Sequence, residues 1–135
     1  MTVLVDTNVL LDVVEDDPVW AEWSLEQLER LSVSEKLVIN PIIYAELSIG
    51  FARIEELDNM LSVTGLALAE IPRPALFLAG KAFQIYRKRG GAKAGVLPDF
   101  FIGAHAAVAG MSLLTRDTGR YQSYYPTLNL IHPED

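Results

Sequence analysis

The chain has 135 residues, of which 50% are hydrophobic and 21% charged, with a net charge of −7 and no cysteine. This length and composition predict one globular domain, spanning residues 1–135, rather than a disordered chain. The absence of cysteine excludes disulfides, thiolate metal sites and thiol nucleophiles, and it fits a reducing compartment. The opening residues do not resemble a signal peptide, and the longest weakly polar stretch, residues 100–114, is too short to cross a bilayer. We therefore expect a soluble cytoplasmic protein with no membrane partner.

Short apolar runs that end in polar or turn residues alternate with longer segments of helical periodicity. In chain order, the predicted elements are a strand at 3–5, helices at 9–14 and about 20–31, a strand at 36–39, helices at 42–49 and 54–61, a strand at 66–71, a helix at 75–88, a basic loop at 89–95, a helix at 98–109, and strands at 112–115 and 128–131. This alternation predicts an α/β fold with a mainly parallel five-stranded sheet flanked by helices.

The charge is distributed unevenly along the chain. Residues 1–70 hold 14 acids and three bases, whereas residues 71–98 hold six bases and no acid. The excess of acids disfavours a nucleic-acid partner, but the basic segment offers one place where phosphates would bind. The alternative interpretation of that segment is a solvated helix end and loop.

Four carboxylates follow or approach the predicted strand ends. Asp6 follows the first strand directly, Glu46 lies early in the helix after the second, Asp99 opens the helix before the fourth, and Asp117 follows the fourth. In an open parallel sheet, the carboxyl ends of the strands meet at one edge, where ligands bind. Clustered carboxylates repel one another, and an all-oxygen set suits Mg²⁺, with Mn²⁺ as a substitute. Such a site predicts metal-assisted cleavage of phosphodiesters.

Each of these acids also has a purely structural interpretation. Asp6 is a favoured helix N-cap, and Asp117 precedes Thr118 and a glycine in a turn-forming sequence. Glu46 suits a solvated helix face, and Asp99 suits a helix start because of the helix dipole. All four share one predicted sheet edge, and this shared position favours a site.

Four segments of the chain, in order, resemble the motifs of PIN-domain ribonucleases. They are residues 3–10, which read Val-Leu-Val-Asp-Thr-Asn-Val-Leu, residues 40–47 around the glutamate, residues 97–106 around Leu-Pro-Asp, and residues 113–117 followed by Tyr121. Each motif alone is weakly specific, but the four together in this order are specific, and the resemblance covers essentially the whole chain.

A PIN domain of this size is similar to the VapC-type toxins of prokaryotic toxin–antitoxin pairs. The resemblance implies a Mg²⁺-dependent endoribonuclease that cuts structured RNA such as tRNA or rRNA and leaves 5′-phosphate and 3′-hydroxyl ends. It also implies a VapB-type antitoxin whose tail lies across the acidic groove, often with an arginine in it. A homodimer and a sheet of order 3-2-1-4-5 complete the expectation.

The family's functional residues carry over by motif. Asn8 and Thr115 match the polar residues that orient water or the acids. Gly119 and Arg120 stand where some relatives carry a further acid, which argues against a fifth ligand. The resemblance assigns the acidic, catalytic and metal-binding cluster to Asp6, Glu46, Asp99 and Asp117, with Asp6 and Asp99 as the surest ligands.

Basic and aromatic residues supply the remaining candidates. The candidate RNA-phosphate contacts in the basic segment are Arg87, Lys88, Arg89 and Lys93. Arg116 and Arg120 flank Asp117, so they either pair with the acids or contact RNA. His105 lies opposite Asp99 in helical phase and is predicted to be structural. For the residues Trp20, Trp23, Tyr121, Tyr124 and Tyr125, packing is favoured over base stacking.

Three other classes of protein compete with the nuclease interpretation. A phosphoacceptor receiver domain needs an aspartate after the third strand, where this chain has Pro72-Arg73-Pro74. A nucleotide-binding module needs a glycine-rich phosphate loop after the first strand, and none is present. A PIN-like domain that binds protein or RNA without catalysis stays open, although the complete set of acids disfavours it.

Overall fold

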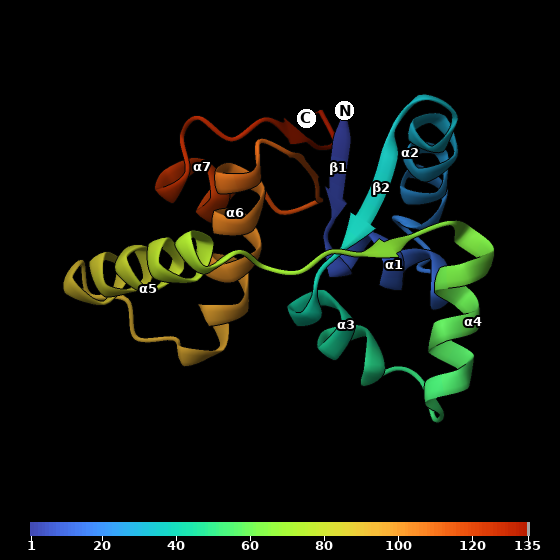
Figure 1. Cartoon of the computed structure of the whole chain (residues 1–135), viewed down its shortest axis with the longest axis horizontal. Helices are drawn as coiled ribbons and strands as arrows, with labels where there is room; N and C mark the ends of the chain where they lie inside the picture. Colours follow the sequence, from blue (N-terminus) through green and yellow to red (C-terminus); the bar gives the residue numbers. More distant parts are fainter. Residues whose placement is uncertain (135) are drawn as a thin grey trace.

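The computed structural model describes residues 1–134, and its strands form one five-stranded sheet in which every neighbouring pair is parallel. The order β3-β2-β1-β4-β5 confirms both the predicted α/β class and the order implied by the resemblance (Figure 1). The strands are β1 (Thr2–Val5), β2 (Lys36–Ile39), β3 (Ala67–Leu68), β4 (Ser112–Leu114) and β5 (Leu130–Ile131).

Helices cover both sides of this sheet. Figure 1 shows α5, α6 and α7 on one side of β1 and β2, with α2 and α4 on the other and α3 beyond the ends of the strands. Burial on both faces explains why the central strand is a continuous apolar run, in which Val3, Leu4 and Val5 are fully buried. The helices are α1 (Thr7–Val14), α2 (Ala21–Ser34), α3 (Pro41–Ser48), α4 (Ile54–Thr64), α5 (Arg73–Lys88), the 3₁₀ turn η1 (Ala94–Val96), α6 (Leu97–Ala109) and α7 (Gly119–Tyr124).

The ends of β1 and β4 meet where the winding of the sheet reverses. From β1 the chain adds β2 and β3 on one side, then crosses through α5 and α6 to add β4 and β5 on the other. Val5 pairs with Leu114, and the next amide, Asp6 N–H, donates to the Leu114 carbonyl at 2.9 Å. This register places Asp6 beside Thr115, at the position where α/β sheets bind ligands.

The start of α3 is set by a local sequence signal and a long-range contact. The Asn40 side-chain oxygen accepts the Ile43 amide at 2.9 Å, and Pro41 occupies the first turn. The Asn40 amide nitrogen lies 3.2 Å from His105 Nδ1, and both residues are buried. His105 is therefore a hydrogen-bonded structural residue, as predicted, and burial lowers its pKa.

Some of the predicted elements differ from the structure for physical reasons. The fifth strand, expected at 128–131, comprises only Leu130–Ile131, the residues that pair with Leu113 and Leu114 of β4. The third strand, expected at 66–71, comprises only Ala67–Leu68, because its sole partner, β2, ends at Ile39 before the chain turns into α3. The segment after Asp117, for which no element is predicted, forms α7. Six residues are too few for a clear periodic signal, and packing against α6 stabilises this helix.

Within residues 1–134, no helix combines the length and the apolar character that a bilayer crossing requires.

Candidate functional site

Asp6 is the buried centre of the site, and its two oxygens have different partners. Oδ1 accepts the Thr7 amide at 2.7 Å and caps α1, so the structural interpretation of Asp6 is also correct. Oδ2 accepts the Thr115 hydroxyl at 2.8 Å and the Tyr121 hydroxyl at 3.0 Å. The side chain thus joins the ends of β1 and β4 to helix α7, while only 5% of the residue is exposed.

The protonation of Asp6 reflects this burial. Burial raises the pKa of Asp6 to about 6, and the negative charge of Asp99 contributes in the same direction. The hydrogen bonds from Thr115, Tyr121 and Thr7 oppose this rise because they stabilise the carboxylate. Burial, together with the negative charges nearby, raises the pKa of Tyr121 well above its usual value, so the phenol stays protonated and donates to Asp6.

Asp99 lies in the first turn of α6, and its surroundings bring the four acids together. Burial raises the pKa of Asp99, and the charges of Asp117 and Glu46 add to that rise. Arg120 opposes it by donating from Nη1 to Oδ2 at 2.6 Å. Since Asp6 also interacts with Asp99, each of the other three acids is electrostatically coupled to this residue. These charge effects are consistent with the grouping expected from the strand ends, and the role of the four acids as one site stays a prediction.

Glu46 and Asp117 lie nearer the surface than Asp6. Glu46, from α3, accepts the Thr7 hydroxyl at 2.6 Å through Oε1. Asp117 is exposed, and its amide donates to the Thr115 hydroxyl oxygen at 3.1 Å. Thr7 is not among the predicted site residues, although its place directly after Asp6 in the first motif is a signal that could have identified it.

A match to a known family accounts for this arrangement. The sequence profile described as PIN domain matches residues 3–124, which include all four acids. The chain belongs to the PIN domain family. No curated protein matches it significantly.

Solved structures share the fold of this PIN domain at low sequence identity. VapBC2 from Rickettsia felis, bound to a DNA fragment from its promoter, is 20% identical with a TM-score of 0.75, and the match covers 99% of this chain and 100% of that one. VapBC-1 from nontypeable Haemophilus influenzae is 20% identical with a TM-score of 0.73 and 98% coverage of both chains. FitAcB from Neisseria gonorrhoeae is 21% identical with a TM-score of 0.67 and 95% coverage of both. Identities this low establish a shared fold.

Asn8 and Thr115 form a chain of hydrogen bonds that leads to Asp6. Thr115, fully buried, donates to Asp6 and accepts from the Asn8 side-chain amide at 3.3 Å. The Asn8 side-chain oxygen accepts the backbone N–H of Arg116 at 3.2 Å. Thr115 therefore contacts Asp6 directly, whereas Asn8 reaches it only through Thr115, and the orienting role that the resemblance implies for both residues stays a prediction.

The chemistry of the donor set fits a hard divalent cation. Four carboxylates, without sulfur or imidazole, are the ligands that Mg²⁺ and Mn²⁺ accept. Burial is the main cause of the raised pKa values of Asp6 and Asp99, and repulsion between the acids adds to it; a cation would offset both effects. In residues 1–134, however, no three such side chains are arranged in ligating geometry. The Asp99 carboxylate is paired with Arg120, and the Glu46 carboxylate is bonded to Thr7.

The basic segment lies beside the Asp99 end of the site. Arg120 contacts both Asp99 and the Tyr86 ring, whose centroid is 5.9 Å from its guanidinium carbon. Arg89 lies over Tyr124 at 5.5 Å, so α5 and α7 share a surface of arginine and aromatic side chains. The four candidate RNA contacts within the basic segment are all exposed: Arg87, Lys88, Arg89 and Lys93.

The remaining predicted residues make packing and pairing contacts within the protein. Tyr121 and Tyr125 are buried, which fits the predicted packing role. Arg116, left open between pairing and RNA contact, forms an ion pair with Asp12 at 2.6 Å. Asp12 is absent from the predicted site, because nothing in its local sequence distinguishes it from other helical acids.

Proposed function

We propose that this PIN domain is a metal-dependent endoribonuclease and the toxin of a VapBC-type toxin–antitoxin pair. The observation that carries the proposal is the position of Asp6, buried where the ends of β1 and β4 meet at the switch point of the sheet, and the charge effects of Asp6, Glu46 and Asp117 on Asp99 support it. A buried acid with a pKa near 6 is poorly placed for stability alone, and perturbed acids of this kind cluster at functional sites.

In this proposal, Asp6 and Asp99 are the principal Mg²⁺ ligands, and Glu46 and Asp117 complete the set, with Mn²⁺ as a substitute. A bound cation supplies water activation and charge neutralisation at the phosphate. Thr115 and Tyr121 hold the Asp6 carboxylate in one orientation through hydrogen bonds of 2.8 and 3.0 Å. Arginines and lysines on α5 and the loop after it contact RNA phosphates and offset the repulsion between RNA and the acids.

One observation favours a second candidate function, a PIN domain that binds a partner without cleaving RNA. Arg120 pairs with Asp99 in the described structure, and a permanent pair would deny a cation one of its two principal ligands. Incubation with RNA in the presence or absence of a divalent cation, described below, distinguishes the two functions, because only the nuclease requires the cation.

The toxin proposal includes two protein partners, a VapB-type antitoxin and a second copy of this chain. It also places the protein in the cytoplasm, where its RNA substrate is found. Its support comes from the fold shared with VapBC and FitAcB structures. Exposed apolar side chains on α5 supply surface for a partner to cover: Leu76, Phe77 and Ile85 are 43%, 69% and 44% exposed.

The test is incubation of purified protein with total RNA in Mg²⁺ or in EDTA, followed by mapping of new ends. We expect discrete cuts with 5′-phosphate and 3′-hydroxyl ends in Mg²⁺ alone. Asp6→Asn and Asp99→Asn should each lower cleavage by more than the roughly 10- to 100-fold typical for loss of an outer-shell partner of a metal ligand.

Asp16→Asn is the matched control. Asp16 is exposed and has a φ of 49°, a conformation that asparagine tolerates, so this variant should cleave RNA as the wild type does. Cuts that persist in EDTA, or full activity in folded Asp6→Asn and Asp99→Asn proteins, would contradict the proposed metal chemistry. RNA binding without cleavage in any divalent ion would favour the second function.

A further inference from the structure

Asp12 is a fifth carboxylate near the site, and both of its oxygens accept hydrogen bonds from other side chains. It lies in α1, one turn beyond Asn8, and is 3% exposed. Arg116 donates to it twice, from Nε to Oδ2 at 2.6 Å and from Nη2 to Oδ1 at 2.8 Å. Ser24, fully buried in α2, adds a third hydrogen bond at 2.7 Å. Asp12 thus has the bidentate partner that a buried carboxylate requires.

Arg116 is held by further contacts besides Asp12. Its guanidinium carbon lies 5.1 Å from the centroid of the Trp20 ring. Its backbone N–H donates to the Asn8 side-chain oxygen at 3.2 Å. Asn8 and Asp12 are four residues apart on α1, so one face of this helix holds both the backbone and the side chain of Arg116. We call Asp12, Trp20, Ser24 and Arg116 the Arg116 clamp.

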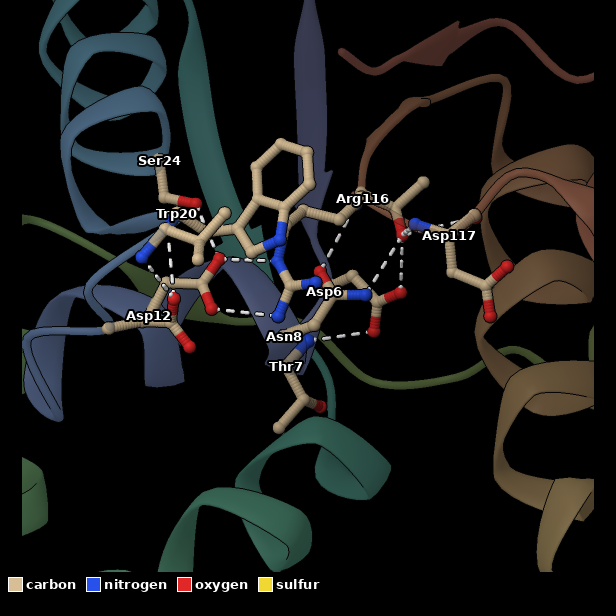
Figure 2. Close-up of polar contacts among 11 residues, drawn as sticks. Asp6, Thr7, Asn8, Asp12, Trp20, Ser24, Arg116 and Asp117 are labelled. Carbon is tan, nitrogen blue, oxygen red and sulfur yellow. Dashed lines mark hydrogen bonds and ion pairs between the residues drawn. The ribbon is translucent and has the colours of Figure 1, made fainter. Parts of the chain in front are cut away.

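The two neighbours of Arg116 are site residues. Thr115 donates to Asp6 at 2.8 Å, and Asp117 is an acid of the proposed metal site. Figure 2 shows the Arg116 side chain reaching toward Asp12 while the Asp117 carboxylate points the other way. A residue that is anchored by both its backbone and its side chain restricts the positions of the residues on either side of it.

We infer that Arg116 is a positioning residue, and that the Arg116 clamp fixes Thr115 and Asp117 relative to Asp6. The pair is only partly accessible, with 27% of the Arg116 side chain and 3% of the Asp12 side chain exposed. Both oxygens of Asp12 are therefore occupied by donors within the protein. The inference rests on the proposed nuclease function for its kinetic consequence, but its structural claim stands apart from that function.

A contact with RNA phosphate is the competing role for Arg116, and kinetics separate the two roles. If the clamp positions the site, Asp12→Asn and Arg116→Ala should both lower kcat by roughly 10- to 100-fold with little change in KM. If Arg116 binds phosphate, Arg116→Ala should raise KM and reduce the salt dependence of binding. Asp12→Asn should then leave both KM and the salt dependence unchanged.

Arg116→Lys sharpens the comparison and guards against misfolding. Lysine keeps a positive charge beside Asp12 and serves as a phosphate contact, but it cannot form the bidentate pair. The clamp predicts that Arg116→Lys loses kcat and leaves KM unchanged. The matched control is Arg53→Lys, because Arg53 forms an exposed ion pair with Glu55, and this variant should retain wild-type kinetics.

Hydrogen exchange tests the clamp without any activity. In Asp12→Asn and Arg116→Lys, the amides of residues 115–117 should lose protection while those of β1 keep theirs. Unchanged protection at 115–117 overturns the inference, and so does a change in KM alone. If the wild type cleaves no RNA but protection at 115–117 is lost in both variants, the nuclease proposal fails while the clamp stands.

Discussion

Asp6 shows at the scale of one residue how a helix cap and a reactive group coincide. One oxygen caps α1, and the other accepts hydroxyl hydrogens from Thr115 and Tyr121. The cap fixes the carboxylate where the strands end, and burial there raises its pKa to about 6. When no cation is bound, ionisation of Asp6 therefore lowers the free energy of unfolding.

The raised pKa of Asp6 predicts a pH dependence of folding. Because the folded pKa of about 6 exceeds the ordinary aspartate value of 3.8, the folded state binds more protons between these values. The contribution of Asp6 to stability is greatest below pH 3.8, and it is lost as pH rises through 6. The difference corresponds to about 3 kcal/mol of unfolding free energy.

We expect Asp6→Asn, measured by urea denaturation in EDTA, to be more stable than the wild type at pH 7. Its advantage should shrink as the pH falls toward 4, because the wild-type carboxyl then becomes protonated. A constant difference between the two proteins across this range would show that Asp6 ionises normally when folded.

At the scale of elements, the contact between α6 and α7 decides whether the site is complete. Helix α7 supplies Tyr121 to Asp6 and Arg120 to Asp99, and it packs against α6 at Gly103. A Cβ atom at residue 103 would lie 2.5 Å from the Tyr125 ring and 3.0 Å from the Tyr121 ring. The absence of a side chain at Gly103 therefore permits the close approach that brings α7 to the acids.

Gly103→Ala tests this packing. Overpacking of a core typically lowers the free energy of unfolding by about 1–3 kcal/mol, and we expect a decrease of that size in thermal or urea unfolding. Gly80→Ala is the control: Gly80 lies within α5 with nothing within 4 Å of the added atom, so alanine should raise stability by up to about 1 kcal/mol. Equal effects of the two substitutions would mean that α6 and α7 do not pack as described.

At the scale of the whole molecule, charge is segregated along the chain. The acids of residues 1–70 dominate the net charge of −7, whereas the bases of residues 71–98 lie on α5 and the loop that follows it. Arg120 and Tyr86 connect that basic surface to Asp99. RNA is therefore expected to approach over α5 and α7 rather than over α2.

Charge reversal at Arg87 and Arg89 tests this path. RNA binding in EDTA should weaken, and the slope of log K against log salt should fall by roughly 0.7 for each single-strand phosphate that the protein no longer neutralises. The control is Arg30→Glu, which reverses an exposed charge on α2, across the sheet from α5, and should leave the wild-type slope unchanged. A wild-type slope in the double variant would remove the basic segment from the RNA interface.

Local patterns in the sequence were sufficient for the α/β class and for choosing the four acids as candidates, whereas the strand order came from the resemblance to PIN domains. Apolar runs that end in polar residues indicated where all five strands lie. Burial on both faces demands such runs in the central strands β1, β2 and β4, whereas the edge strand β3 is exposed and β5 is half-buried. Asp6 and Asp117 follow those runs closely enough for a parallel sheet to bring them to one edge. The sequence did not predict the short helix α7 or the true length of β3, because neither depends on a local periodicity.

The partners of those acids were decided only by the tertiary structure. Arg116 and Asp12 are 104 residues apart in sequence, and Tyr121 and Asp6 are 115 apart. A local pattern indicates which residues are buried and with what period, but it does not identify the distant side chain that each of them contacts. The choice of Asp12 for Arg116 and of Asp99 for Arg120 follows from how α1, α6 and α7 pack around the sheet.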